Sequence, residues 1–202
     1  MEPHPIFAAV YDWVMVPQDW LGLRKQRQEI VHAAKGKVLE LGVGTGLNLP
    51  LYREVTKVIG VDPDPYMLKR AYARLKKAAA PIELCRSSAE ELPFEEGTFD
   101  TVVSTLVFCT IPDADKAARE VHRVLKPEGT FQFLEHVKSE TPVLAKAQDA
   151  LTPLWKKLFG GCHLNRNTLA LFQRNGFEIT RLQKVKYDVV WRGTARPSSS
   201  SS

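Results

Sequence analysis

The chain has 202 residues, of which 44% are hydrophobic and 25% are charged, and its formal net charge is +5. These values are typical of one soluble globular domain with a full hydrophobic core. No apolar run approaches the roughly 20 residues that a membrane-spanning helix needs, and the first residues show no secretory signal. The mild basic excess is compatible with anionic membranes, acidic ligands or nucleic acid, and it selects none of them.

Short apolar runs alternate with amphipathic stretches, which predicts an α/β fold with a parallel sheet and helices on both faces. The predicted strands span 37–41, 57–62, 82–85, 99–105, 130–135, 178–183 and 189–195. The predicted helices span 21–34, 65–79, 113–125 and 168–175, and a turn is expected over 126–129. Only residues 184–188 connect the last two strands, which is too short for a helical crossover, so these strands should pair antiparallel. The expected result is a Rossmann-like, seven-stranded mixed sheet with an antiparallel last strand.

Two segments, 1–20 and 137–166, lie outside this alternation and are predicted to cap the sheet within a single domain that spans 1–197. Both carry apolar and aromatic residues at helical spacing. Either they only exclude water from the sheet, or one of them also lies on a membrane surface from which a lipophilic substrate enters. Pro153 is expected to kink or break a helix in the second segment. The serine run 198–202 is predicted to be disordered.

The three cysteines, Cys85, Cys109 and Cys162, are odd in number and widely spaced. They form neither a metal-binding pattern nor a disulfide framework, so no metal site is predicted and a cytoplasmic location is favoured. Cys109 and Cys162 are interpreted as buried small hydrophobic residues, since this is the commoner role of such cysteines.

The stretch KVLELGVGTGLNLPLY joins an apolar strand to three glycines at alternate positions, Gly42, Gly44 and Gly46. A dinucleotide-binding fingerprint has its third glycine one position later, and a P-loop needs a Gly-Lys-Ser/Thr sequence that is absent here. Glu40 precedes the loop and suits a cationic ligand group, whereas Asp62, which ends the next strand, can accept both hydroxyls of a ribose. Two such carboxylates without a phosphate clamp describe S-adenosylmethionine.

The motifs VLELGVGTG, VIGVDPDPYML, SSAEELPFEEGTFDTVVS and VHRVLKPEGTFQFLEHV, in this order, resemble the class I S-adenosylmethionine-dependent methyltransferases, in particular the quinone-biosynthesis (UbiE-like) group. The resemblance covers nearly the whole chain and implies the same seven-stranded fold. Ser88 departs from the Asp that many relatives have there, so its hydrogen bond to adenine is expected to be weaker or to come from the backbone. The cofactor-binding residues implied by the resemblance and by the glycine loop are Tyr11, Glu40, Gly42, Val43, Gly44, Gly46, Asn48, Asp62, Pro63, Met67, Ser88, Ala89, Thr105 and Leu106.

A narrower resemblance lies in LTPLWKKLFGGCHLNRNTLALFQRNGF, which is similar to membrane-associated thiol methyltransferases and their bacterial relatives. The apolar stretch STLVFCTIPD at the end of the fourth strand favours a small or lipophilic acceptor, with a thiol as the first choice and a quinol ring or a phospholipid amine as the alternative. His136 and His163 are the candidate catalytic bases, and a purely structural hydrogen bond is the competing interpretation for each. Arg166 either holds an acidic group of the acceptor or caps a neighbouring segment.

Two rival functions use the same first half of the fold. An NAD-dependent oxidoreductase is disfavoured because Leu47 occupies the position of the third glycine and because the last strand is reversed. A non-catalytic or RNA-associated binding protein is disfavoured because Lys and Arg form no concentrated run. No nucleic-acid partner is therefore expected, and the oligomeric state stays open.

Overall fold

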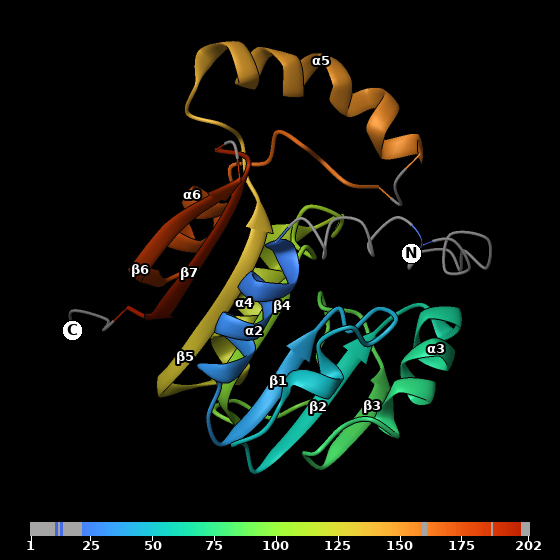
Figure 1. Ribbon diagram of the computed structural model, residues 1–202. Coiled ribbons are helices and arrows are strands. Elements are labelled where there is room, and N and C mark those ends of the chain that lie inside the picture. The colour runs from blue at the N-terminus through green and yellow to red at the C-terminus, as the bar shows by residue number, and fades with distance from the viewer. Residues whose placement is uncertain (1–10, 12, 14–21, 159–160, 187, 199–202) are drawn as a thin grey trace.

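The computed structural model describes residues 11, 13, 22–158, 161–186 and 188–198. The strands are β1 (Lys37–Leu41), β2 (Lys57–Asp62), β3 (Ile82–Arg86), β4 (Phe99–Thr105), β5 (Leu125–His136), β6 (Phe177–Lys186) and β7 (Val190–Pro197). They form one sheet in the order β3-β2-β1-β4-β5-β7-β6 (Figure 1). Strands β1 to β5 pair in parallel, and β7 runs antiparallel to both β5 and β6. The predicted mixed sheet with a reversed last strand is confirmed.

The helices of the described residues cover both faces of this sheet, as predicted. They are α2 (Arg24–His32), α3 (Pro65–Leu75), α4 (Ala114–Val124), α5 (Pro142–Leu158), α6 (Thr168–Arg174) and the short 3-10 helix η2 (Leu49–Leu51). Helix α3 ends four residues before its predicted end, and α5 occupies the middle of the predicted second cap.

Alternating side chains of the central strands divide the core into two layers. Leu39, Leu41 and Val102 pack against α4 and α6 on one face of the sheet. Val38 and Val103 pack against α2 on the other face. Both faces of β1 and β4 are therefore covered, which explains why these strands appear in the sequence as continuous apolar runs.

The strand order reverses between β1 and β4. The chain leaves β1 toward β2 and β3, and then returns to place β4 on the other side of β1. In open α/β sheets, ligands bind outside the carboxyl ends of the strands at such a switch point. This edge lies at the top of the sheet in Figure 1, beneath α5.

The turn expected over 126–129 is wrong, because β5 begins at Leu125 and continues through these residues. Leu125 pairs with Phe99, and after a shift in register Thr130 pairs with Thr101. The Pro-Glu-Gly run is thus accommodated as an irregularity within the strand.

Helix α5 does not break at Pro153, where a kink or a break was predicted. Pro153 lies inside the helix, which runs on to Leu158, and the ribbon curves along its length in Figure 1. The Thr152 hydroxyl donates to the Gln148 carbonyl oxygen at 2.6 Å, a contact that often accompanies bending of a helix. The proline therefore does not end the helix.

The predicted termini are only partly visible. Of the first cap, 1–20, only Tyr11 and Trp13 belong to the described residues. Ser198 donates its backbone N–H to the Gly176 carbonyl oxygen at 2.8 Å, and the rest of the serine run lies outside the described residues. Within the described part of the chain, no helix has the length and apolar character needed to cross a membrane.

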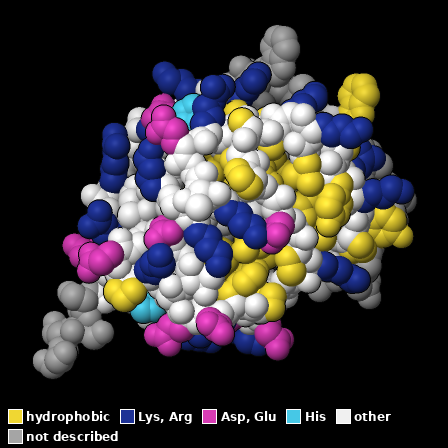
Figure 2. Space-filling model, turned by 90° about the horizontal axis from the view of Figure 1, so that it is seen from below, with side chains coloured by type: hydrophobic (Ala, Val, Ile, Leu, Met, Phe, Trp, Pro, Cys, Tyr) yellow, Lys and Arg dark blue, Asp and Glu magenta, His cyan; other side chains and the backbone are white. Residues whose placement is uncertain are grey.

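The face at the amino ends of the strands carries scattered charge. Figure 2 shows Lys and Arg side chains spread over this face, with hydrophobic side chains gathered on one side of it. No concentrated basic patch is visible on the face drawn.

Candidate active site

The loop after β1 presents its backbone at the switch point. Gly42, Gly44 and Gly46 have φ values of 61°, 54° and 84°. A Cβ atom at Gly42 would lie 2.6 Å from the Val107 side chain, so this loop packs directly against the loop after β4. Among the described residues, a Cβ atom at Gly44 would meet no atom nearer than the Gly42 carbonyl oxygen at 3.9 Å. The described part of the chain therefore leaves the space over Gly44 open, and a ligand can lie directly on the backbone there.

Asp62 ends β2 beside this loop and is 8% exposed. Its Oδ2 accepts a hydrogen bond from the Gly44 N–H, and its Oδ1 accepts one from the Asp64 N–H, both at 2.9 Å. Burial raises the pKa of Asp62 to about 6, and the two N–H donors oppose this effect. Each carboxylate oxygen keeps a second lone pair, so Asp62 can also accept hydrogen bonds from neighbouring hydroxyls of a ligand.

The residues after Asp62 are fixed by the start of α3. Asp64 caps the helix by accepting from the Tyr66 and Met67 N–H groups at 2.7 and 3.4 Å. The Pro63 carbonyl oxygen accepts from Arg86 Nε at 3.2 Å. The turn that positions Asp62 is thus held by the cap and by the neighbouring strand.

Glu40 lies behind the glycine loop in a buried polar network. Its Oε1 accepts from the Asn48 amide at 3.0 Å, and this amide also donates to Thr105 and accepts from Arg27. Burial raises the pKa of Glu40 to about 7, against the effects of the Tyr52 hydroxyl, Asn48 and Arg27. Among the described residues, Glu40 Oε2 has no hydrogen-bond partner of normal geometry. A buried carboxylate oxygen of this kind suits a ligand that brings a cationic group.

Tyr11, in the first cap, packs against the core layer that contains Val38 and Val103. Burial raises the pKa of its hydroxyl, Arg27 opposes this effect, and the charges of Cys109 and Asp62 add to it. The hydroxyl is therefore within electrostatic reach of the carboxylate after β2 and of the thiol after β4.

The loop after β4 is strained and is held by Glu135. Leu106 has a φ of 57°, which costs a residue other than glycine on the order of 1–3 kcal/mol. Glu135 is completely buried and accepts from the Ser104 hydroxyl, from the Val107 N–H at 3.0 and 3.1 Å, and from the Phe108 N–H at 3.2 Å. Burial raises the pKa of Glu135 to about 7, while these donors oppose the shift.

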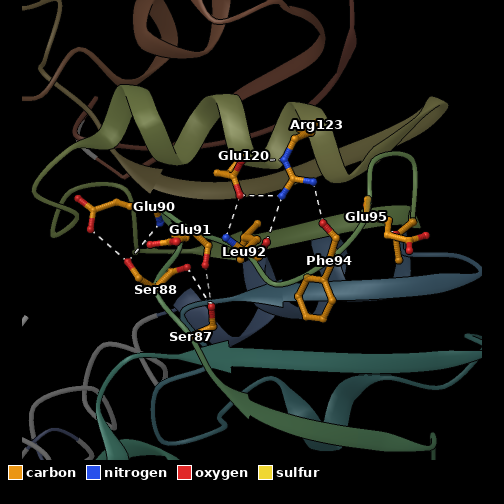
Figure 3. A network of polar contacts seen from close by, with 10 residues as sticks. Ser87, Ser88, Glu90, Glu91, Leu92, Phe94, Glu95, Glu120 and Arg123 are labelled. Carbon is orange, nitrogen blue, oxygen red and sulfur yellow. Dashed lines mark hydrogen bonds and ion pairs between the residues drawn. The ribbon is translucent and has the colours of Figure 1, made fainter.

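The loop after β3 is tied to α4 (Figure 3). Arg123 donates to the carbonyl oxygens of Phe94 and Leu92 at 2.7 and 3.1 Å and pairs with Glu120 at 2.7 Å. Glu120 in turn accepts from the Leu92 N–H at 2.8 Å. These contacts fix the loop that carries Ser88 and Ala89.

Ser88 uses its hydroxyl inside this loop. The hydroxyl donates to Glu90 Oε2 at 3.1 Å and accepts from the Glu90 N–H at 3.2 Å (Figure 3). Its proton and one of its lone pairs are thereby used inside the loop, and the second lone pair of Ser88 Oγ can still accept a hydrogen bond from a ligand.

Three further side chains converge beyond the ends of β4 and β5. Cys162 Sγ lies 3.9 Å from His136 Nδ1, and the donor atoms of Cys109, His136 and Cys162 all lie within 4.8 Å of one another. The hydrogen bond with Cys109 and the neighbouring His136 hold the pKa of Cys162 below its usual range. The same hydrogen bond and burial raise the pKa of Cys109. The two cysteines are buried, as predicted, but they lie in a polar cluster.

His163 and Arg166 mainly contact backbone carbonyl groups. His163 Nδ1 lies 3.1 Å from the Cys109 carbonyl oxygen, and burial lowers the pKa of the ring. Arg166 donates to the carbonyl oxygens of Phe108 and Ile111, the latter at 2.7 Å. Arg166 was predicted either to hold an acidic group of the acceptor or to cap a neighbouring segment. These contacts correspond to the second role, capping of the loop after β4.

Most of the predicted cofactor-binding residues lie near the carboxyl ends of β1, β2 and β4 or in the loops that follow β1 to β4. They are Glu40, Gly42, Gly44, Gly46, Asn48, Asp62, Pro63, Ser88, Thr105 and Leu106. The Val43 side chain packs instead in the core with Leu49 and Leu68, and its N–H donates to the Val61 carbonyl oxygen. Met67 and Ala89 are buried, at 7% and 9% exposure.

Residues 39–133 match the family of the methyltransferase domain. Thiol S-methyltransferase TMT1A of Homo sapiens is 32% identical over 163 residues, which cover 79% of this chain and 67% of that protein. The chain belongs to the S-adenosylmethionine-dependent methyltransferases. The rival of an NAD-dependent oxidoreductase is thereby set aside.

Two further matches agree with this family. Phosphatidylethanolamine N-methyltransferase of Cereibacter sphaeroides is 36% identical over 130 residues, which cover 63% of this chain and 64% of that protein. The crystal structure of the YcgJ protein of Bacillus subtilis superposes with a TM-score of 0.66 at 26% identity, and the match covers 82% of this chain and 75% of that one. The methyltransferase thus spans about two thirds of the length of the two curated relatives named above.

Some residues of this methyltransferase site were not assigned a role from the sequence. Arg27 is 4% exposed, yet nothing in its helix distinguishes it from neighbouring basic residues. Tyr52 follows the glycine loop in a segment without periodicity. Glu135 has no role in the prediction, although a carboxylate inside the apolar run FQFLEH is a usable signal. The contact between Cys162 and His136 has no sequence signal, because 26 residues separate them.

Proposed function

We propose that this methyltransferase binds S-adenosylmethionine between the glycine loop, Asp62 and Glu40, and that it methylates a small or lipophilic thiol. The open backbone over Gly44, with the Asp62 carboxylate hydrogen-bonded to it, supports the cofactor assignment. The observation that carries the choice of a thiol is the 32% identity to a thiol S-methyltransferase over 79% of the chain.

Bound there, S-adenosylmethionine supplies a methyl group on a positively charged sulfur. Asp62 accepts hydrogen bonds from the ribose hydroxyls, and the absence of a side chain at Gly44 lets the ligand lie on the loop. Glu40 contributes negative charge behind the loop, where it balances a cationic group. The Ser88–Ala89 backbone contacts the adenine, and Tyr11 covers the edge and excludes water.

The acceptor lies next to the ends of β4 and β5. A thiol has a pKa near 8.5, so it needs little help to lose its proton. His136 and His163 are the proposed proton acceptors. The lowered pKa of His163 keeps this ring neutral at pH 7, which is the form that a base requires.

The acceptor class is tested with a panel of thiols, amines, phenols and a quinol, scored by the release of S-adenosylhomocysteine. We expect release with small lipophilic thiols that exceeds the rate without acceptor at least tenfold. Reactions without acceptor are the control. If no thiol in the panel causes release of S-adenosylhomocysteine but a quinol or phosphatidylethanolamine does, the acceptor belongs to one of the alternative classes.

We also propose that α5 touches an anionic lipid surface, from which a lipophilic acceptor reaches the site. Val143, Leu151 and Leu154 are 76%, 53% and 59% exposed. At 100° per residue, these side chains fall within one quadrant of the helix. Lys146 and Lys157 both fall along one side of this apolar stripe, and basic residues beside an apolar face are typical of helices that lie at a membrane interface.

Co-sedimentation with vesicles of anionic and zwitterionic lipid tests this contact. We expect binding to anionic vesicles at low salt, with at least a fivefold loss for the double substitution Leu151→Ser and Leu154→Ser. The matched control is Leu182→Ser, because Leu182 is also exposed, at 41%, but lies on β6. Wild-type protein that stays entirely in the supernatant would rule the contact out.

A further inference from the structure

Two thiols and one imidazole meet at the acceptor side of the site from three separate parts of the chain. Cys109 belongs to the turn after β4, His136 is the last residue of β5, and Cys162 precedes α6. Their donor atoms lie within 4.8 Å of one another. Cys109 and Cys162 are 1% and 7% exposed, and His136 is half-buried.

Hydrogen bonds to backbone carbonyl oxygens hold the segments that carry these three residues. None of these bonds uses a cysteine sulfur or a nitrogen of the His136 ring. The His163 N–H donates to the Cys109 carbonyl oxygen at 2.7 Å, which joins the loop before α6 to the turn after β4. The Thr168 hydroxyl donates to the His136 carbonyl oxygen at 2.9 Å. The Lys138 N–H donates to the Arg166 carbonyl oxygen at 2.9 Å. The segments therefore stay together whether or not the thiols and the imidazole bind anything.

We propose that Cys109, His136 and Cys162 bind one Zn²⁺ ion. Two thiolates and one imidazole form the donor set that Zn²⁺ prefers, and three protein ligands with a free fourth position are typical of a catalytic zinc site. Tetrahedral bonds of about 2.3 Å to sulfur and about 2.0 Å to nitrogen place donor atoms roughly 3.5–3.8 Å apart. The observed 3.9 Å between Cys162 Sγ and His136 Nδ1 is close to this spacing.

The free position of the zinc ion takes the thiol acceptor, an extension that rests on the proposed function. A thiol that coordinates zinc loses its proton, because the metal stabilises the thiolate. His136 is then a zinc ligand rather than a proton acceptor, so His163 is the base that remains available. The S–H bond breaks, the proton passes to His163 and then to solvent, and the electron pair stays on the sulfur, so nothing is oxidised or reduced. The acceptor is thus held as the nucleophilic thiolate at the edge that also carries the cofactor residues.

The zinc site is tested on the full chain by metal analysis and by cobalt spectroscopy. Protein reconstituted with Zn²⁺ and freed of excess metal is expected to retain one zinc ion per chain. Co²⁺ alone should give the near-ultraviolet charge-transfer band of cobalt–thiolate bonds. Cys162→Ser and His136→Asn should each lower zinc retention at least tenfold. Cys85→Ser is the matched control and should retain the metal, since Cys85 lies on β3 outside the cluster.

Several results would overturn the site. They are the absence of retained zinc in wild-type protein, equal retention in Cys162→Ser and Cys85→Ser, and a thiol count showing that Cys109 and Cys162 form a disulfide under the reducing conditions of the reconstitution. Circular dichroism separates the loss of metal from the loss of fold in each variant.

Binding of a thiol at the free position of the metal is measured separately, by the visible spectrum of the cobalt-loaded protein. Addition of 2-mercaptoethanol should change the visible cobalt bands of the loaded protein, and an unchanged spectrum would exclude coordination of the thiol. If cobalt binds as expected and no thiol in the panel is methylated, the proposed function fails and the metal site stands. If thiols are methylated by protein that binds no metal, the metal site fails and the proposed function stands.

Discussion

Replacing Asp62 with alanine is expected to weaken the binding of S-adenosylhomocysteine at least 100-fold. Two hydrogen bonds from ribose hydroxyls to a carboxylate are lost, at roughly 1.5–3 kcal/mol each. The Gly44 and Asp64 N–H groups also lose their acceptor, which loosens the loop under the ligand. Isothermal titration calorimetry measures the Kd. Asp115→Ala is the matched control, since this aspartate pairs with Arg174 and accepts a hydrogen bond from the Asn175 side chain, away from the glycine loop.

The pH dependence of the same Kd provides a second check on Asp62. The pKa of Asp62 is raised to about 6. Above pH 6 Asp62 is mostly ionised and can accept hydrogen bonds from both ribose hydroxyls, whereas below pH 6 it is mostly protonated. Affinity should therefore fall as the pH drops from 8 to 5, with a further contribution from Glu40, whose pKa is about 7. Asp62→Asn should reduce this dependence. An Asp62→Ala variant with unchanged affinity would refute the ribose assignment.

Replacing Glu135 with alanine is expected to lower the free energy of unfolding by about 4 kcal/mol. Three buried donors, the Ser104 hydroxyl and the Val107 and Phe108 N–H groups, would lose their acceptor, at roughly 1–3 kcal/mol each before water compensates in part. For a chain of this size, about 4 kcal/mol corresponds to a decrease in Tm of roughly 8–16 °C. Differential scanning calorimetry measures it.

Two further variants define the role of Glu135. Glu135→Gln keeps the volume and one acceptor oxygen, so it should lose less stability than the alanine variant. Glu83→Gln is the control, because Glu83 only forms an exposed ion pair with Lys57 and should change Tm by less than about 2 °C. A loss below about 1 kcal/mol in Glu135→Ala would show that the loop after β4 does not depend on this carboxylate.

The order of the secondary structure followed from the sequence because it is encoded locally. Alternating apolar runs and amphipathic stretches predicted the strands and helices, and the short connection over 184–188 predicted the reversed last strand. Errors arose where a local signal was overridden by packing. The residues 126–129, which have the sequence of a turn, lie within β5, because β5 pairs with β4 both before and after them.

The meeting of the glycine loop and Asp62 at one edge of the sheet was also predictable, since their elements are sequential. The glycine loop follows β1 directly, and Asp62 ends the next strand, so the distance along the chain and the parallel order place them at one edge. The direction of the Val43 side chain did not follow from the sequence, because alternate residues in a loop point away from each other and only packing shows which ones face the core.

The sequence by itself determined the sheet, the glycine loop and the position of Asp62, because each depends on residues that are near neighbours in the chain. Only the tertiary structure decided that Glu135 holds the loop after β4 and that Cys109, His136 and Cys162 meet. These contacts join segments about 26 residues or more apart, and they form only because strands β4 and β5 pair and the loop before α6 folds back onto their ends. The periodicity of the sequence does not predict such contacts between distant segments, because they depend on burial and on long-range packing.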